Sequence, residues 1–202
     1  MSSLPPPEHD REHDREHHRQ LQNSLPRGFV RKSGDGWVNC GCGNRHWGLF
    51  GAAGLFLAKR GADGRWSHVV LQHRALWSHQ GGTWGVPGGA LMEGETPVEA
   101  ALREAHEEAG VSSTSVIPLA SHEFTHPDWS YTTIVAESAG PLHTIGATDS
   151  ESLEIEWVEL PLLRLAAASD DRQITRNGEV VEFLPAFRSS LPRLLQLLDE
   201  QE

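Results

Sequence analysis

The chain has 202 residues, of which 38% are hydrophobic, and its formal net charge is -11 at pH 7. This length suits one domain with a sizeable core, and no apolar run approaches the roughly 20 residues of a membrane span. The negative charge argues against broad binding to nucleic-acid backbone, although metal ions can still bridge the protein to a small phosphorylated substrate. The composition does not predict an oligomeric state.

The first 27 residues form a charged, low-complexity segment that includes EHDREHDREHHR. Such a segment has little to bury, so we expect residues 1–27 to be a disordered tail and residues 28–202 to be a single domain. Four histidines fall in this tail: His9, His13, His17 and His18. They could gather a metal ion, although solvated tails of this kind are far commoner.

The start of the chain lacks the basic and apolar regions of a secretion signal, and only two cysteines are present. We therefore expect a cytoplasmic protein. Cys40, Cys42 and His46 have side chains that bind zinc in other proteins. No second C-x-x-C or other paired ligand accompanies them, so we do not predict a zinc site there.

Apolar runs separated by turn-forming residues predict the elements of the domain. Strands are expected at 48–58, 68–76, 114–124, 129–137 and 153–160. Helices are expected at 97–109, 160–168 and 183–200. Strands on either side of a central helix, with a helical C-terminus, predict an α/β layered domain.

The central helix has clear start and stop signals. Thr96 is a good N-cap, Pro97 suits the first helical position, and Glu99 completes a T-x-x-E capping box. Gly110 suits the position after the helix. The helical period gathers apolar side chains into one face, which we expect to pack on the core: Val98, Ala101, Leu102, Ala105 and Ala109.

Three carboxylates form an adjacent stripe on the same helix: Glu104, Glu107 and Glu108. Ala100 lies inside this stripe and leaves room above the carboxylates. Like charges at i,i+4 cost a few tenths of a kcal/mol, and basic partners are nearly absent nearby. Glu108 also lies in the last turn, where the helix dipole disfavours negative charge. A divalent cation would remove this conflict, so the pattern predicts a site for Mg²⁺ or Mn²⁺.

A family resemblance follows from these residues. Gly89, Glu95 and the run REAHEEAGV at 103–111 resemble the complete Nudix box, G-x5-E-x7-R-E-U-x-E-E-x-G-U. The one soft departure is Ala105, where a larger aliphatic residue is more usual. The preceding WGVPGG at 84–89 is similar to the lead-in of MutT-type members. The resemblance implies a Nudix-type α/β/α sandwich with a mixed sheet, and hydrolysis of diphosphate bonds in nucleotides.

Carried over by position, the resemblance implies metal contacts from four groups: the Gly89 carbonyl, Glu104, Glu107 and Glu108. Glu104 is also the implied base for the attacking water. Arg103 would hold the box by pairing with carboxylates, and Glu95 would brace the loop. MutT-type enzymes have an additional acidic residue in a later loop, for which Glu151 is the first choice and Glu154 the alternative.

Residues that contact the substrate are less sharply indicated. Arg74 and His79 precede Gly89 at the spacings of a phosphate-contacting arginine and a nearby histidine in MutT-type enzymes, although surface residues near a strand end would look the same. Arg74 should end a strand that runs beside the loop at Gly88 and Gly89. Three tryptophans could stack on a base, but core positions are commoner for such residues: Trp77, Trp84 and Trp129.

We therefore predict a MutT-like pyrophosphohydrolase of nucleoside triphosphates such as 8-oxo-dGTP, with a small nucleotide as its partner. A hydrolase of ADP-ribose or a nucleotide sugar is the alternative. Members of that branch have a proline downstream of the box, and Pro127 lies 16 residues after Val111, near that position. A non-catalytic nucleotide sensor is less well supported, because degenerate boxes usually mark that class and this box is intact.

Overall fold

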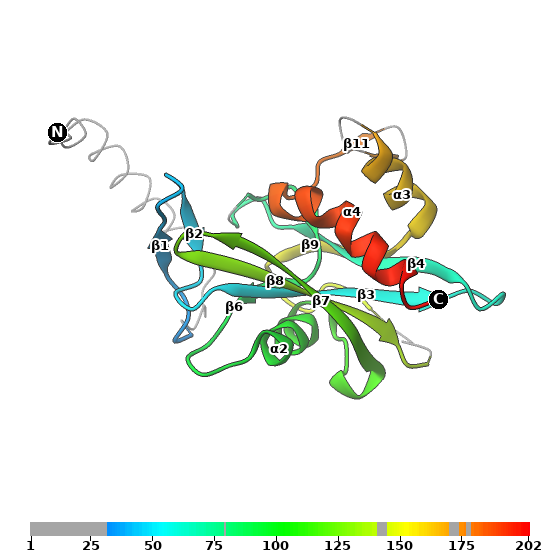
Figure 1. Ribbon diagram of the computed structural model, residues 1–202, viewed down its shortest axis with the longest axis horizontal. Coiled ribbons are helices and arrows are strands. Elements are labelled where there is room, and N and C mark those ends of the chain that lie inside the picture. The colour runs from blue at the N-terminus through cyan, green and yellow to red at the C-terminus, as the bar shows by residue number, and fades with distance from the viewer. Residues whose placement is uncertain (1–31, 79, 141–144, 170–173, 177–178) are drawn as a thin grey trace, which may run out of the picture. The chain divides into compact units, whose positions relative to one another are not determined.

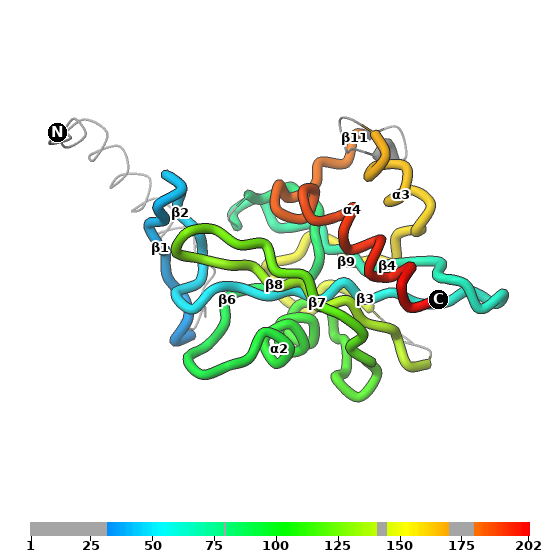
Figure 2. Tube along the Cα trace, in the orientation of Figure 1, coloured from blue at the N-terminus to red at the C-terminus, as the bar shows by residue number. Residues whose placement is uncertain are grey.

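The computed structural model describes residues 32–78, 80–140, 145–169, 174–176 and 179–202, which form the compact unit that begins at Lys32 (Figures 1 and 2). The expected tail at 1–27 and the substrate-binding candidate His79 lie outside the described residues. Among the helices of the described part, none combines the length and apolar character needed to cross a membrane.

A seven-stranded mixed sheet forms the centre of this unit. Its strands are β3 (Ala52–Arg60), β4 (Trp66–Arg74), β5 (Trp84–Gly85), β6 (Gly88–Ala90), β7 (Val116–His126), β8 (Trp129–Ser138) and β9 (Ser152–Glu159). The main strand order is β5-β4-β3-β8-β7, with β6 paired to β3 and β9 paired to β4. The β3–β8 pair is parallel, whereas the other pairs are antiparallel.

Helices cover both faces of the sheet. Figure 1 shows α2 (Pro97–Ala109) on one side, with α3 (Leu160–Ala168) and α4 (Pro185–Asp199) on the other. Successive residues of β3 point to opposite faces, so Leu55 and Leu57 join the core beneath α2, while Phe56 joins the core beneath α3 and α4. This arrangement is the predicted α/β/α sandwich with a mixed sheet.

Several short elements escaped sequence prediction. These are β1 (Trp37–Asn39), β2 (Arg45–Trp47), β5, β6, η1 (Ser113–Ser115), β10 (Ile174–Arg176) and β11 (Glu179–Val181). β1 pairs with β2 and β10 pairs with β11, each as an antiparallel hairpin. Strands of two or three residues are too short to show a hydrophobic period, so only their pairing partners define them.

The central helix has the predicted limits. The Glu99 amide donates to Thr96 Oγ1 over 3.3 Å, and the Thr96 amide donates to Glu99 Oε2 over 2.9 Å, which completes the capping box. Gly110 ends the helix in a left-handed conformation with φ of 68°, which glycine adopts without steric cost.

The predicted buried face of α2 was partly wrong. Val98 is 38% exposed, whereas Ala100 is fully buried. The buried residues instead form an arc that includes two members of the acidic stripe: Ala100, Ala101, Glu104, Ala105, Glu108 and Ala109. Alanines allow the helix to approach the sheet closely, and this approach turns part of the acidic stripe inward. The helix therefore carries two carboxylates into the protein.

Helix α3 offers a matched test of the core beneath the second helical layer. Leu163 is fully buried, whereas Leu165 in the same helix is 67% exposed. We expect Leu163→Ala to lower the free energy of unfolding by about 2–5 kcal/mol, because the change leaves a cavity. Leu165→Ala should change it by no more than about 0.5 kcal/mol. Urea denaturation of both variants measures the difference, and equal losses would contradict the packing described.

Candidate active site

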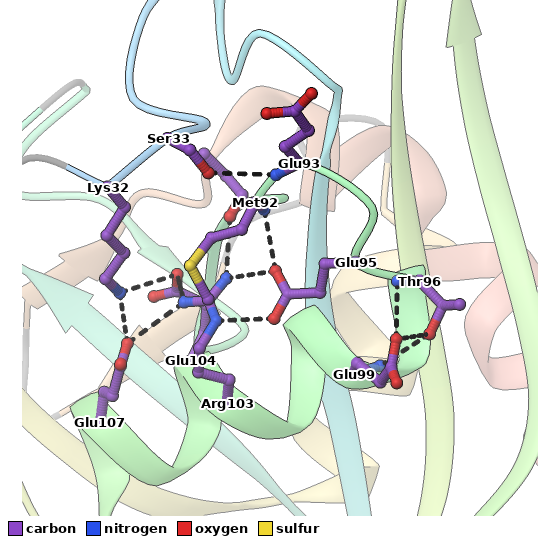
Figure 3. Close-up of polar contacts among 11 residues, drawn as sticks. Lys32, Ser33, Met92, Glu93, Glu95, Thr96, Glu99, Arg103, Glu104 and Glu107 are labelled. Atoms are coloured by element: carbon purple, nitrogen blue, oxygen red, sulfur yellow. Dashed lines mark hydrogen bonds and ion pairs between the residues drawn. The ribbon is translucent and has the colours of Figure 1, made fainter.

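The guanidinium of Arg103 joins three segments at one end of the sheet (Figure 3). Its Nε and Nη2 atoms donate to the two oxygens of Glu95, each over 2.7 Å. Nη2 also donates to the Ala90 carbonyl over 3.0 Å, and Glu95 Oε2 accepts from the Met92 amide over 2.9 Å. The hydrogen bonds from Arg103 hold the pKa of Glu95 below its usual range. Arg103 on α2 is thus linked both to β6 and to the loop that follows it, and its pair with Glu95 in that loop is bidentate.

Lys32 reaches the acidic stripe from a distant part of the sequence. Its ammonium lies 3.4 Å from Glu104 Oε1 and forms an ion pair with Glu107 (Figure 3). Arg103 Nη1 contacts Glu104 as well and lies 3.2 Å from Glu107 Oε2. The expectation that basic partners are nearly absent was therefore wrong, because the second cation comes from before the first strand.

Burial raises the pKa values of Glu104 and Glu108. Glu104 is 8% exposed and Glu108 is 3% exposed. Burial raises the pKa of Glu104 despite the nearby charges of Lys32 and Arg103. Burial and the negative charge of Glu104 raise the pKa of Glu108 to about 8, against the opposing effects of Arg74, Gln72 and the Gly88 amide. Glu107, by contrast, is exposed.

Two glycines allow the sheet to approach these carboxylates. The Gly88 amide donates to Glu108 Oε2 over 2.8 Å. A Cβ atom at Gly89 would lie 2.7–2.8 Å from the carboxyl atoms of Glu104, so a side chain there would displace that group. Buried carboxylate oxygens crowded beside backbone groups are the donors that Mg²⁺ and Mn²⁺ prefer. The residues present therefore fit a divalent cation.

The loop that carries Glu151 is attached to the C-terminal end of α2. The Thr148 amide donates to the Glu108 carbonyl over 3.1 Å, and the Thr148 hydroxyl donates to the Glu107 carbonyl. Burial and the charges of Asp149 and Glu104 raise the pKa of Glu151. Glu151 therefore lies close enough to Glu104 for their charges to interact. The alternative candidate, Glu154, is exposed on β9.

Arg74 lies next to this loop, opposite Ser152 in the β4–β9 ladder. Its charge lowers the pKa values of both Glu108 and Glu151, although burial raises both values overall. The positive charge of Arg74 is thus close enough to act on Glu108 and Glu151. The strand that pairs with β6 is β3 and not β4, so the expected neighbour of the Gly88–Gly89 segment was wrong.

The tryptophans separate into two groups. Trp84 is buried in the core beneath α3 and α4, as expected, and its ring stacks on His73. Trp77 and Trp129 are only half-buried and belong to neither core cluster. The ring of Trp129 stacks on that of His46. The described contacts of Trp84 and Trp129 therefore involve histidines of the protein itself.

The fold and the box together define a class of enzyme. The sequence model of the NUDIX domain matches residues 50–178, and the chain belongs to the Nudix hydrolase family, whose members act on pyrophosphate bonds and generally use a divalent metal ion.

Relatives agree with this membership. The chain is 42% identical over 181 residues to a Mycobacterium tuberculosis protein named "Putative 8-oxo-dGTP diphosphatase 3", covering 83% of this chain and 82% of that protein. It is 49% identical over 174 residues to a Bifidobacterium longum "Nucleoside triphosphate pyrophosphatase/Nudix hydrolase fusion protein". That match covers 85% of this chain but only 33% of the fusion protein. The crystal structure of a Nudix hydrolase from M. smegmatis, RenU, matches with a TM-score of 0.68 at 37% identity, covering 84% of this chain and 98% of that chain.

Glu108 generates a prediction about metal-free stability. Its pKa in the folded protein, about 8, lies above its ordinary value of 4.5, so the folded state holds the proton more strongly than the unfolded state. This carboxyl therefore destabilises the metal-free protein increasingly as pH rises from about 5 to 8. We expect Glu108→Gln to raise the melting temperature in EDTA, and to raise it more at pH 8 than at pH 5.

The control for this experiment is Glu154→Gln, which removes an exposed carboxylate from β9. It should retain the pH slope of the wild type in thermal melts. A Glu108→Gln variant that is destabilised at pH 8 in EDTA would contradict this prediction, because it would show that the buried carboxylate contributes stability in the absence of metal.

Proposed function

We propose that the protein is a Mg²⁺-dependent pyrophosphohydrolase of nucleoside triphosphates, with an oxidised purine nucleotide such as 8-oxo-dGTP as its leading substrate. The observation that carries the proposal is the pair of buried carboxylates, Glu104 and Glu108, beside the exposed Glu107. Such a pair is unfavourable for folding alone, but it is suited to binding divalent cations that in turn bind phosphates.

The residues of the site would have two kinds of role, binding the metal and positioning the metal ligands. Glu104, Glu107 and Glu108, with the Gly89 carbonyl and Glu151, would hold the metal. When bound, Mg²⁺ would lower the pKa of water and neutralise charge on the phosphoryl oxygens. Arg103 and Glu95 would keep the carboxylates in place without touching the substrate, as positioning residues.

Glu104 is the proposed acceptor for a proton from the attacking water. Glu104 is 8% exposed, so its carboxylate is largely shielded from bulk water. Gly89 limits the space on one side of it, and Arg103 contacts one oxygen. These contacts restrict the orientation of the carboxylate, as a general base requires.

The proposed substrate class has support from the relatives. One relative, most of whose length is covered by the match, has a name that specifies an 8-oxo-dGTP diphosphatase. Arg74 adds a positive charge that acts on both Glu108 and Glu151. Its guanidinium is suited to a phosphate that the metal ions leave uncompensated.

The experiment that tests this function is a substrate panel with Mg²⁺ that includes 8-oxo-dGTP, the four normal dNTPs and ADP-ribose. We expect the highest kcat/KM for 8-oxo-dGTP. The Glu104→Gln variant should lose about 10²–10⁴-fold in kcat, the usual effect of removing a general base. Reactions in water labelled with oxygen-18 would identify the phosphorus atom that is attacked, because the label enters the product that contains this atom.

Two results would count against the proposal. A higher kcat/KM for ADP-ribose than for every triphosphate would favour the nucleotide-sugar branch. Retention of more than about a tenth of wild-type kcat by Glu104→Gln would remove that residue from the role of base.

Arg74 is tested by its kinetic effect on the same reaction. We expect Arg74→Ala to raise KM and to lower kcat/KM about 10–100-fold, the scale of one charge-assisted hydrogen-bonding group at about 1.5–3 kcal/mol. Arg74→Lys should recover only part of the loss, because an ammonium cannot bind a phosphate bidentately. Arg193→Ala, on the exposed side of α4, is the matched control. Wild-type kinetics for a folded Arg74→Ala protein would refute the assignment.

A further inference from the structure

A second cluster of metal-ligating side chains lies outside the acidic stripe. Cys40 and Cys42 lie in the turn between β1 and β2, His46 is on β2, and His126 ends β7. Each residue offers one ligand atom, and the four atoms all lie within 4.8 Å of one another. Three of the residues are close in sequence, whereas the fourth is supplied by a strand 80 positions later. This fourth residue is the partner that sequence analysis did not find.

The distances between the four ligand atoms suit the tetrahedral coordination of one ion. Zinc binds sulfur at about 2.3 Å and imidazole nitrogen at about 2.0–2.1 Å, so neighbouring ligands of a tetrahedral site lie about 3.3–3.8 Å apart. Cys42 Sγ and His46 Nε2 are 3.2 Å apart. No two of the four ligand atoms are more than 4.8 Å apart, so zinc binding would require only a modest shortening of the longest distance. Two sulfurs and two imidazoles form one of the common ligand sets of structural zinc sites.

Local backbone structure brings the two thiols together. The Gly43 amide donates to the Cys40 carbonyl over 3.0 Å, and the Cys40 amide donates to the Asn44 carbonyl over 3.0 Å. Gly43 adopts a φ of +87°, which lets the chain turn tightly between the ligands. The Asn44 side-chain amide also lies 3.8 Å from Cys42 Sγ, to which it donates.

The imidazoles are held in position by their neighbours. The rings of His46 and His126 lie 4.2 Å apart, and Trp129 stacks on His46 at 4.5 Å and 12°. Trp129 Nε1 donates to the Trp47 carbonyl over 3.1 Å, which fixes the indole against β2. The Gly41 amide donates to Asp128 Oδ2 over 2.7 Å, so the turn between the cysteines also contacts the β7–β8 hairpin.

We propose that Cys40, Cys42, His46 and His126 bind one structural Zn²⁺ ion that joins the β1–β2 hairpin to the β7–β8 hairpin. Binding would release the two thiol protons to solvent and leave four protein ligands around the ion. Four protein ligands leave no position for a substrate, so the site is structural and not catalytic.

The zinc site would also support the acidic cluster indirectly. The segment that leads into β1 contains Lys32, which contacts Glu104 and Glu107. It also contains Ser33, whose hydroxyl accepts from the Glu93 amide over 3.1 Å. Zinc would restrain this segment at its far end. Loss of zinc should therefore weaken the contacts of Lys32 with Glu104 and Glu107. The zinc proposal itself does not depend on the proposed catalytic function.

The test uses the chain of residues 1–202 without an affinity tag. Purified protein should contain one zinc per chain. Replacement by Co²⁺ in the presence of excess Mg²⁺ should produce the intense visible absorption of a tetrahedral site, together with sulfur-to-cobalt charge transfer. Excess Mg²⁺ occupies the carboxylates, and the histidines at positions 9 to 18 cannot produce the sulfur band. Both readouts are independent of enzymatic activity.

Matched variants assign the ligands. His126→Asn and Cys42→Ser should each weaken Zn²⁺ binding by at least about 100-fold, since loss of a ligand should exceed the 10–100-fold effect of losing an outer-shell partner. His122→Asn is the control, because His122 lies four residues earlier on the same face of β7. It should retain full zinc and the cobalt spectrum.

Three results would overturn the proposal. The first is wild-type protein that lacks zinc after expression in zinc-supplemented medium and shows no sulfur-to-cobalt band. The second is a His126→Asn variant with unchanged zinc content. The third is a disulfide between Cys40 and Cys42, detected by mass spectrometry in freshly purified wild-type protein. The wild-type measurements decide the matter even if a ligand variant fails to fold.

Discussion

The bidentate pair between Arg103 and Glu95 is the interaction on which the rest of the site depends. The guanidinium also reaches the Ala90 carbonyl and the carboxylates of Glu104 and Glu107. The side chains of Arg103 and Glu95 are both half-buried, so removing either partner would leave the other charge partly desolvated and without compensation. Loss of Arg103 would leave four acidic groups around β6 and α2, with Lys32 and Arg74 as the described cations that act on members of this group.

The acidic cluster shows a conflict between folding and function. Two glutamates on the buried arc of α2 must be desolvated when the helix packs on the sheet, which raises their pKa values. Lys32 and Arg103 offset part of the repulsion, but Glu108 contacts neither of them in the described structure and is 3% exposed. A site that is unfavourable without its cation can bind that cation tightly, and such local violations of folding rules are expected where a protein acts.

Local signals explain what the sequence predicted well. The limits of α2 depend on a capping box, a proline at its start and a glycine at its end, all within the segment itself. The long strands and the two later helices show clear hydrophobic periods. The buried arc of α2 was harder to predict, because a helical wheel treats Glu104 and Glu108 as polar and cannot show how closely Ala101 and Ala105 let the sheet approach.

Contacts between distant segments explain what was missed. Lys32 forms an ion pair with Glu107, which lies 75 residues later in the sequence. The ring of His126 lies beside that of His46, which lies 80 residues earlier. Neither pairing has a fixed spacing, so no motif could reveal it. The β1–β2 hairpin, whose strands are too short for a period, carries three of the four clustered zinc-type ligands. The sequence thus indicated the acidic residues of the candidate site but not the cation that balances them.

The central claim is that the acidic stripe on α2 is a divalent-metal site, at which a bound cation would compete with the Lys32 ammonium for Glu104 and Glu107. Anomalous diffraction from crystals soaked in Mn²⁺ tests this claim most directly. The account predicts a manganese peak in contact with the carboxylates of Glu104 and Glu108, with the Lys32 ammonium withdrawn from Glu104. No peak among these carboxylates at saturating Mn²⁺, with Lys32 still bound to Glu104 and Glu107, would contradict it.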